Sequence, residues 1–294
     1  MFTPSQLLGL SQAQQVRLSH IDFRVNYLGS VGRLDLIKRF GIKEAAATRD
    51  LTEYKNLAPQ NLTFDGQSKK YVRADTFESL FNFSSSQVLT ALSQGLGEDF
   101  IGNHKPYLYC ETPAQLNSPS LAVLSVLSRA IYQKMVVEIG YRSLTSGTTS
   151  RDIIPFALAD NGLRWHVRAF DRRRARFSDF VVTRISDPVI TQSEVLEHET
   201  RDQDIQWNRI VELEIVPHPK IEYSETIEYD YGMIDGVLKV NVRAALAGYV
   251  LRKWNVDCST NHTLEGDEVH LWLRNSPALY GVQNILLAPG YEHP

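Results

Sequence analysis

Residues 32–59 read GRLDLIKRFGIKEAAATRDLTEYKNLAP, and this stretch decides the fold of the first part of the chain. One face of a short first helix is predicted from the spacing of Leu34, Ile37 and Phe40. Gly41 is placed to end that helix, and a second helix is predicted from about Lys43 to Tyr54, with Pro59 preventing its extension. Helix, glycine-containing turn and helix is the order of a helix-turn-helix, whose second helix enters the major groove of DNA.

The flanking segments complete a winged helix. Upstream, residues 13–28 have apolar and aromatic side chains at three- and four-residue steps, which predicts a helix ended by Gly-Ser-Val-Gly at 29–32. Downstream, residues 61–75 make two short β-prone runs around Asp-Gly-Gln-Ser at 65–68. A winged helix sets such a basic hairpin against the DNA backbone, so residues 1–85 are predicted to be a winged helix-turn-helix domain.

The second helix and the hairpin supply the predicted DNA contacts. Three alanines at 45–47 keep the helix slim enough to approach the groove floor, and Thr48 and Arg49 are placed to reach base edges. The predicted DNA-binding residues are Lys43, Ala46, Thr48, Arg49, Tyr54, Lys55, Ser68, Lys69 and Lys70. The alternative is a small helical domain whose lysines are merely solvated.

The distribution of charge also points to a nucleic-acid partner. Residues 1–74 hold 11 Lys and Arg against 6 Asp and Glu, a balance of +5, whereas residues 199–294 hold 8 against 15, a balance of −7. A basic piece joined to an acidic piece fits a nucleic-acid reader attached to a domain that must avoid nucleic acid. A chance fluctuation of composition is the other interpretation.

The bulk composition is that of a globular protein with packed cores. The 294 residues are 43% hydrophobic, and they begin without the basic start and long apolar run of a signal peptide. No apolar stretch approaches the ~18 residues that a membrane span needs. Cys110 and Cys258 match neither a disulfide nor a metal framework. We therefore expect a reduced, cytoplasmic protein with no cofactor, no metal and no membrane partner.

The middle of the chain changes from helix to strand. Residues 120–135 are helix-periodic, and residues 144–151 are read as a turn. Short strands are predicted at 136–143, 152–160, 163–170 and 177–185. Asn161-Gly162 between two of them is a strong hairpin signal. One helix followed by short antiparallel strands predicts a small β-barrel of the SH3 or Sm kind over residues 119–197.

Residues 162–185, GLRWHVRAFDRRRARFSDFVVTRI, place cations on these strands. Strand alternation puts His166 and Arg168 on one face. We expect hairpin pairing to bring Phe180 and Arg184 of the returning strand beside them. Arginine forks bind phosphate and aromatic faces stack on bases. The predicted pocket for a nucleotide or nucleic-acid strand is formed by Tyr141, Ser143, Arg151, His166, Arg168, Phe180 and Arg184.

Two further expectations attach to this segment. His166 titrates near neutrality, so a ligand phosphate would hold it protonated. The arginines at the tip of the hairpin are expected to be solvated charges: Arg172, Arg173, Arg174 and Arg176.

Tyr141, the stretch 151–155, Trp165 and the ending 180–185 follow one layout, and on these residues the segment resembles the WYL domain. That family is named for a Trp-Tyr-Leu triplet, where this sequence has Trp165-His166-Val167. WHVRAF, RDLTEYKNLAPQNLTFD and LYGVQNILLAPGYEHP are similar to one subgroup, the WYL repressors associated with BREX and CBASS phage-defence islands. The resemblance implies a domain that senses a nucleic-acid or nucleotide ligand and controls the attached winged helix.

From Gln206 the pattern becomes β, α, β, α, β, which predicts an α+β sandwich of the ferredoxin type over residues 205–294. The resemblance implies that this domain helps to form a homodimer. A two-fold dimer would present two winged helices to a palindromic operator. The alternative is a domain that packs against the rest of the chain and forms no dimer interface. With a connector at 86–118, the predicted fold class is a multidomain α+β chain.

Four functions remain open at this point. The leading one is a homodimeric repressor of its own phage-defence operon, released from operator DNA by a nucleic-acid or nucleotide effector. A ligand-dependent activator uses the same parts with the opposite sign. An enzyme acting on nucleotides is disfavoured, because the sequence has no HExxH, GxSxG or GxxxxGK[ST] motif and no Cys/His cluster. A module that binds nucleic acid without sequence preference or signalling is the last.

Overall fold

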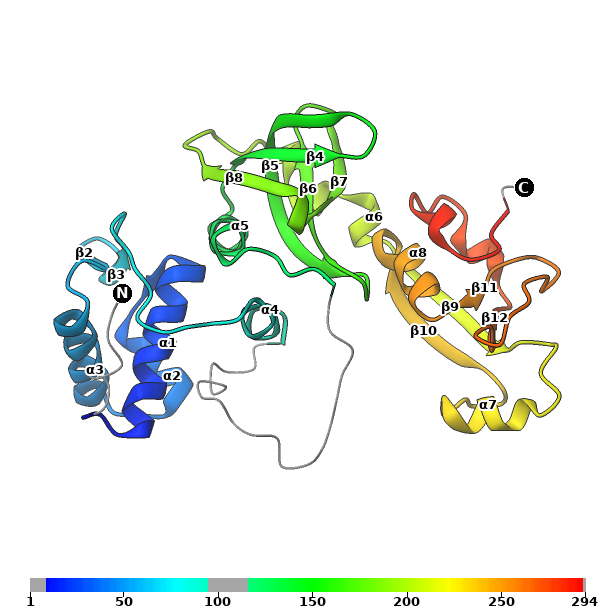
Figure 1. Cartoon of the computed structure of the whole chain (residues 1–294), viewed down its shortest axis with the longest axis horizontal. Helices are drawn as coiled ribbons and strands as arrows, with labels where there is room; N and C mark the ends of the chain where they lie inside the picture. Colours follow the sequence, from blue (N-terminus) through cyan, green and yellow to red (C-terminus); the bar gives the residue numbers. More distant parts are fainter. Residues whose placement is uncertain (1–8, 95–115, 293–294) are drawn as a thin grey trace.

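The computed structural model describes residues 9–94 and 116–292, which build a winged-helix domain, a central β domain and a C-terminal α+β domain in a row (Figure 1). The multidomain α+β class predicted from the sequence is confirmed. Within the described ranges, no helix has both the length and the apolar character that a membrane span requires.

The winged-helix domain has the predicted order of elements. Its helices are α1 (Gln12–Leu28), α2 (Arg33–Phe40) and α3 (Glu44–Leu57), and its strands are β1 (Ser30–Val31), β2 (Leu62–Asp65) and β3 (Lys70–Arg73). The strands form an antiparallel sheet in the order β1-β3-β2. Gly41 ends α2 in the left-handed conformation, at a φ of 63°, and donates its N–H to the carbonyl of Ile37. The predicted helix-turn-helix and hairpin are therefore confirmed.

The buried side of α2 differs from the prediction. Leu34 was placed on the apolar face, but its side chain is 68% exposed, whereas Leu36 is fully buried. Leu36 packs into the core of the domain together with the partly buried Ile37 and Phe40. A helix of only eight residues has too few turns for its spacing to fix which side faces inward.

Helix α1 belongs to two cores at once. Leu18, Ile21 and Val25 are buried in the core of the winged-helix domain. Phe23 and Tyr27 point to the other side and are buried in the core of the central domain. The DNA-binding part is therefore fixed to the central domain by burial of apolar surface, in addition to its covalent connection.

The central domain packs one helix against a five-stranded antiparallel sheet of order β7-β6-β5-β4-β8. Its elements are α5 (Leu121–Gln133), β4 (Val137–Ser143), β5 (Gly147–Asp160), β6 (Trp165–Asp171), β7 (Arg176–Val181) and β8 (Ile185–Ile190). α4 (Ser85–Gln94), from the predicted connector, adds Val88 and Leu89 to the core beneath α5. The rest of that connector up to residue 115 lies outside the described residues.

Strand β5 begins earlier than the sequence predicts. Residues 147–151 were expected to belong to a turn, but they pair with β4 as strand, with Ser143 opposite Gly147. Gly147 has a φ of +65°, which lets the chain reverse direction within three residues. The tight turn leaves Arg151 inside the sheet and not on a loop.

The C-terminal domain contains the predicted strands and helices and one short extra strand, β11. Its elements are β9 (Ile210–Pro217), α7 (Ser224–Asp230), β10 (Leu238–Arg243), α8 (Ala244–Lys253), β11 (Val256–Asp257) and β12 (Leu271–Leu273). The sheet order is β10-β9-β12-β11. A split β-α-β unit of the ferredoxin type leaves another strand between the two that a helix connects. Here β9 and β10 are antiparallel neighbours and β11 is parallel to β12, so the α+β class is confirmed with a different strand order.

Candidate functional site

The exposed face of α3 lies at the outer end of the molecule, with α1 between α3 and α5 (Figure 1). Four of the predicted DNA-binding residues on or next to this helix are exposed: Lys43, Thr48, Arg49 and Lys55. Ala46 is half-buried and Ala47 is fully buried, so the small side chains also seat the helix on its domain. The outward face thus combines cations with side chains that can donate hydrogen bonds, which suits contact with DNA.

The hairpin beside α3 has a turn that its own side chains hold in shape. The carboxylate of Asp65 accepts hydrogen bonds from the amides of Gln67 (3.0 Å) and Ser68 (3.1 Å) and from the hydroxyl of Ser68 (2.5 Å). These bonds, the one from the Ser68 side chain first, lower the pKa of Asp65. Ser68 and Lys69 are exposed at the tip, and Lys70 is half-buried. The predicted wing cations are therefore presented on a preformed turn.

A cleft of about 410 Å³ separates α3 from this hairpin. Its lining is formed by Gly32, Arg33, Thr48, Leu51, Phe64, Gly66, Lys69 and Tyr71. The ring of Phe64 is exposed at the cleft and contacts Tyr71 edge-on, with 5.3 Å between ring centroids. Thr48 from the helix and Lys69 from the wing thus border the same cleft.

Tyr54 does not lie where the sequence placed it. It was predicted to bind DNA, but it is fully buried and its hydroxyl donates to the carboxylate of Asp22 (2.6 Å). Tyr54 lies three and seven residues after Leu51 and Ala47, which are also buried, so the helical period turns it inward. That spacing was visible in the sequence.

Two carboxylates that sequence reasoning missed fix the orientation of α3. Asp50 accepts a fork of hydrogen bonds from Arg17 of α1, at 2.6 and 3.2 Å. Asp22 of α1 accepts from Tyr54, from the amide of Leu80 (3.0 Å) and from the hydroxyl of Ser79. Burial raises the pKa of Asp22 to about 6. Helix α3 is therefore tied to α1 by polar bonds at two points.

The pairing of β6 with β7 divides the predicted effector pocket. Phe180 lies opposite Val167 and Asp179 lies opposite Arg168. Directly paired residues share a face of the sheet, so Phe180 lies on the core face with Val167, while Arg168 lies on the outer face. The prediction that Phe180 and Arg168 line one pocket is therefore wrong by one residue of register.

The core-face group consists of Tyr141, Arg151 and Phe180. The Tyr141 and Phe180 rings meet edge-on at 5.0 Å, and the guanidinium carbon of Arg151 lies 5.8 Å from each ring centroid. Arg151 Nη1 donates to Asp171 Oδ2 at 2.5 Å, and both side chains are buried. The charge of Arg151 is thus already compensated inside the domain.

The outer-face group is centred on Arg168. Its guanidinium donates a fork of hydrogen bonds to Asp204, with Nε–Oδ2 at 2.8 Å and Nη2–Oδ1 at 3.1 Å. Nη1 donates to Asp179 (3.1 Å), whose other oxygen accepts from the Tyr249 hydroxyl (3.0 Å). Asp204 lies in the segment between the central and C-terminal domains, and Tyr249 lies on α8. Arg168 therefore holds two domains together.

His166 contributes to the same joint through its ring. The imidazole stacks on Tyr249, with 5.1 Å between ring centroids and 25° between ring planes. Burial lowers the pKa of His166, so the expectation that it titrates near neutrality is replaced by a neutral imidazole at pH 7. Its Nδ1 atom is buried and has no hydrogen-bond partner among the described residues.

The cations of the hairpin tip fall into two groups. Arg172 was expected to be solvated, but its Nε and Nη2 atoms fork onto Glu199 at 2.7 and 2.8 Å, and Nη2 also donates to the Glu194 carbonyl (2.6 Å). Glu199 lies five residues before Asp204, so Arg172 and Arg168 hold the same interdomain segment. The other three tip arginines are exposed: Arg173, Arg174 and Arg176.

The last two predicted pocket residues lie apart from both groups. Ser143 closes the β4–β5 turn, where its hydroxyl accepts hydrogen bonds from the amides of Thr145 (3.2 Å) and Ser146 (3.3 Å). Arg184 ends the 3-10 turn Val182–Arg184 and is half-buried. The structure thus does not bring the seven predicted residues into one site.

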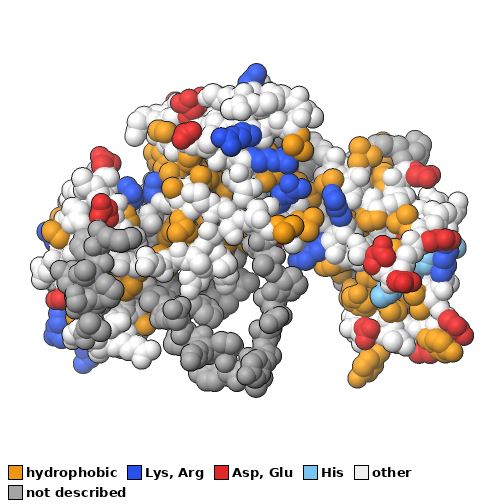
Figure 2. Space-filling view, in the orientation of Figure 1, with side chains coloured by type: hydrophobic (Ala, Val, Ile, Leu, Met, Phe, Trp, Pro, Cys, Tyr) orange, Lys and Arg blue, Asp and Glu red, His pale blue; other side chains and the backbone are white. Residues whose placement is uncertain are grey.

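A cleft of about 470 Å³ lies beside the outer-face group, between β6, β7 and the C-terminal domain. It is lined by Arg168, Arg174, Arg176, Phe177, Ser178, Asp179, Ala245, Tyr249, Gln283 and Asn284. Figure 2 shows Lys and Arg side chains gathered where the central domain adjoins the C-terminal domain. The cleft therefore offers exposed cations, an aromatic ring and amide groups to a ligand.

The described residues contain no group of three His, Cys, Asp or Glu placed to hold a metal ion. Cys258 is buried, and burial raises the pKa of its thiol to about 12. Cys110 lies outside the described residues.

Comparison with known families gives three adjoining matches. Residues 13–94 match the winged helix-turn-helix domain of the BrxR transcriptional regulator, residues 122–190 match the WYL domain, and residues 210–279 match the C-terminal dimerization domain of BrxR. Each match covers one of the domains described above.

Curated relatives extend over most of the chain. A DNA-binding transcriptional repressor CapW from Escherichia coli is 31% identical over 284 residues, which cover 93% of this chain and 93% of the relative. Repressors of the same name are 30% identical in Stenotrophomonas maltophilia (89% of this chain and 92% of the relative) and in Pseudomonas aeruginosa (85% of each).

Proposed function

The chain belongs to the CapW family of DNA-binding transcriptional repressors, and from this premise we propose that it is a homodimeric repressor governed by a nucleotide or nucleic-acid effector. The observation that carries the proposal is the exposed, basic face of α3 beside a preformed wing. Members of this family are named as transcriptional regulators and not as enzymes.

The DNA-binding surface of the proposal is the outward face of α3 together with the wing. Thr48 and Arg49 read base edges, while Lys43, Lys55 and Lys69 hold phosphates. Because two copies are joined through their C-terminal domains, the operator is a palindrome whose half-sites lie whole helical turns apart, ~34–36 Å per turn. We propose that this operator lies upstream of the chain's own phage-defence operon, in line with the similarity of its motifs to such repressors.

The effector site of the proposal is the cleft lined by Arg174 and Arg176. Both arginines are exposed, and neither forms an ion pair with another residue in the described part of the chain. Arginine forks recognise phosphate, so the effector is a nucleotide or a nucleic-acid strand. A phosphate in the cleft competes with Asp179 and Asp204 for Arg168, which is how the effector alters the joint between two domains.

Fluorescence anisotropy on labelled DNA tests this function. The purified protein is titrated onto the duplex upstream of its own gene and onto a scrambled duplex at the same salt concentration, with Arg49→Ala and, as a matched control, Arg142→Ala. Arg142 is an exposed arginine on β4. We expect the wild type and the control to prefer the upstream duplex and Arg49→Ala to lose about 1–3 kcal/mol of that preference. Equal binding of the wild type to both duplexes would refute an operator.

Effectors are then added to the preformed complex. Short single-stranded DNA or a cyclic oligonucleotide should release the wild type, while a variant with Arg174→Ala and Arg176→Ala should stay bound. If the ligand tightens the complex instead, the effector promotes DNA binding and the proposed release is wrong; a transcription assay then separates a ligand-dependent activator from a ligand-dependent repressor. If the double variant is released like the wild type, the effector binds elsewhere.

A further inference from the structure

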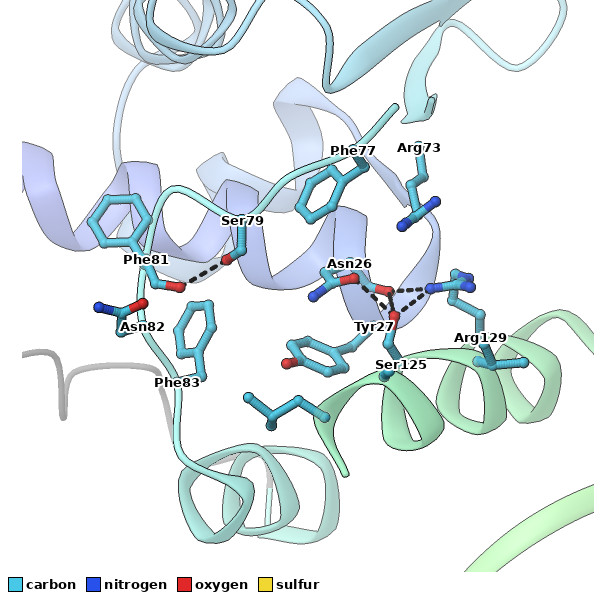
Figure 3. Close-up of a pocket in the computed structure, with 13 residues that line it drawn as sticks. Asn26, Tyr27, Arg73, Phe77, Ser79, Phe81, Asn82, Phe83, Ser125 and Arg129 are labelled. Atoms are coloured by element: carbon cyan, nitrogen blue, oxygen red, sulfur yellow. Dashed lines mark hydrogen bonds between the residues drawn. The ribbon is translucent and has the colours of Figure 1, made fainter. Parts of the chain in front are cut away.

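A third pocket lies at the other joint of the molecule, between the winged-helix domain and α5 (Figure 3). Its volume is about 400 Å³, which is within the range of small-molecule sites. The walls come from α1, from the end of β3 and the segment that follows it, and from α5 between Leu121 and Arg129. Neither the DNA-binding surface nor the effector cleft includes any of its residues.

Two guanidinium groups face each other at one end of this pocket, those of Arg73 and Arg129 (Figure 3). Neither side chain forms an ion pair with a carboxylate among the described residues, and Arg73 Nε is buried without a hydrogen-bond partner. Burial, and then the charge of Arg73, lower the pKa of Arg129 to about 10. Burial also lowers the pKa of Arg73, although the charge of Asp75 opposes it. Two close cations are thus held together without an anion between them.

The contacts that these arginines do make are to neutral groups. Arg129 Nη1 donates to the Asn26 carbonyl (2.7 Å) and to the Ser125 hydroxyl (2.5 Å). Arg73 Nη1 donates to the Ala74 carbonyl (3.2 Å), and its guanidinium carbon lies 5.0 Å from the centroid of Phe77. Each guanidinium has five donors, so both keep N–H groups free for a ligand.

Aromatic rings form part of the remaining wall, beside the polar side chains of Asn26, Ser79 and Asn82 and aliphatic side chains of α5. Phe77 and Phe83 line the pocket beside Tyr27, whose ring meets Phe83 edge-on at 6.2 Å between centroids (Figure 3). Such rings offer flat apolar faces on which a planar ligand group can stack. The pocket therefore places aromatic rings next to its two cations, with Phe77 directly beside Arg73 and Phe83 further along the wall.

We propose that this pocket binds a nucleotide, with the phosphate between Arg73 and Arg129 and the base against Phe77 and Phe83. A dianionic phosphate removes the repulsion between the two guanidinium groups and accepts a fork from each. The same chemistry is carried by a free nucleoside monophosphate and by the 5′-phosphorylated end of a single strand. Helix α1 forms one wall and is bonded to α3 through Arg17–Asp50 and Asp22–Tyr54, so the ligand would contact an element of the winged-helix domain itself.

Isothermal titration of the full-length protein tests this site without DNA. The probes are adenosine monophosphate, inorganic phosphate and a 5′-phosphorylated single-stranded hexamer. The variants are Arg73→Gln, Arg73→Lys and, as a matched control, Arg142→Gln. We expect Arg73→Gln to weaken nucleotide binding at least tenfold, Arg73→Lys to keep the fold and part of the affinity, and the control to bind like the wild type. Whichever of the nucleotide and the hexamer binds tighter identifies the source.

Three results would overturn the proposal. The first is no binding of either the nucleotide or the hexamer by the wild type at millimolar concentration. The second is unchanged binding by both Arg73 variants. The third is equal binding of inorganic phosphate and the nucleotide, which leaves the aromatic wall without a role. A double variant of Arg174→Gln and Arg176→Gln separates this site from the effector cleft. It removes the cations of the cleft, so any nucleotide that it still binds occupies the pocket between Arg73 and Arg129.

Discussion

Replacing Arg168 by alanine should destabilise the joint between the central and C-terminal domains severely. Its guanidinium is bonded to Asp204 and Asp179, and the exposed fractions of the three side chains are only 5%, 2% and 11%. Alanine leaves both carboxylates in a nearly dry environment without their cation. Removing one partner of a buried pair costs about 3–5 kcal/mol, and we expect a loss in that range.

Urea unfolding followed by tryptophan fluorescence measures this loss. The four tryptophans of the chain are Trp165, Trp207, Trp254 and Trp272, all in or between the central and C-terminal domains, so the signal does not report on the winged helix. Arg173→Ala is the matched control, because Arg173 is an exposed arginine of the adjoining turn. Its change should stay within about 0.5 kcal/mol.

A second variant separates lost charge from lost packing. Asp204 accepts hydrogen bonds from the amides of Gln206 and Trp207 at the start of a short helix. Asparagine caps helices equally well, so Arg168→Leu combined with Asp204→Asn removes one of the two unpaired charges, leaves that of Asp179, and keeps the cap. It should lose less stability than Arg168→Ala. If Arg168→Ala unfolds at the same urea concentration as Arg173→Ala, Arg168 does not stabilise the joint and the prediction is refuted. The stable Arg168→Ala protein could then be used to test whether Arg168 takes part in effector binding.

Burial raises the pKa of Asp22 from 3.8 to about 6. The protonated form of Asp22 therefore stabilises the fold fully below about pH 4, and this contribution is lost as the pH rises through 6. The whole contribution amounts to about 3 kcal/mol. Asp22→Asn should flatten that slope, measured by circular dichroism during unfolding at pH 4.5 and 7.5; an unchanged slope contradicts it. Arg49→Ala should cost about 1–3 kcal/mol of operator affinity and relax one position of the operator, measured by anisotropy on single-base variants. Lys69→Ala should weaken binding to all sequences equally and reduce the salt slope by ~1, and a loss of sequence preference would contradict a phosphate contact. Tyr229 and Ile234 are 89% and 78% exposed on the C-terminal domain, so changing both to Asp should convert the dimer to monomers in sedimentation; a double variant that stays dimeric would contradict this interface.

The sequence predicted the elements of this fold well because each carries its own periodic signal. The helices before and after Gly41 and the hairpin around Asp65 were placed to within a few residues. The spacing of apolar residues could not show which side of a short element faces the core. Leu34 and Leu36 differ by two positions on a two-turn helix, and only the packed core decides between them.

The candidate effector site was harder to predict for a similar reason. Arg168 was correctly singled out, but a slip of one residue in the pairing of β6 and β7 exchanges the two faces of the sheet and moves Phe180 away from it. The partner of Arg168 is Asp204, 36 residues later in a segment with no periodic pattern. Contacts of this kind depend on tertiary geometry, and a single sequence contains no signal for them.

The two joints of the chain differ in chemistry, and this decides how a signal can travel. On one side, α1 buries Phe23 and Tyr27 in the core of the central domain. On the other side, no helix or strand of the described residues contributes to both the central and the C-terminal cores. That joint is made by the ion pairs of Arg168 and Arg172, by the hydrogen bond from Tyr249 to Asp179 and by two ring contacts, His166 on Tyr249 and Phe156 on Trp207. Ion pairs can be exchanged for bonds to an anionic effector, whereas a shared core cannot change without repacking. We therefore expect an effector in the cleft to shift the C-terminal domain relative to the central domain. The winged helix moves together with the central domain, because α1 is part of its core. In a dimer joined by its C-terminal domains, that shift changes the distance between the two recognition helices and so their fit to the two half-sites.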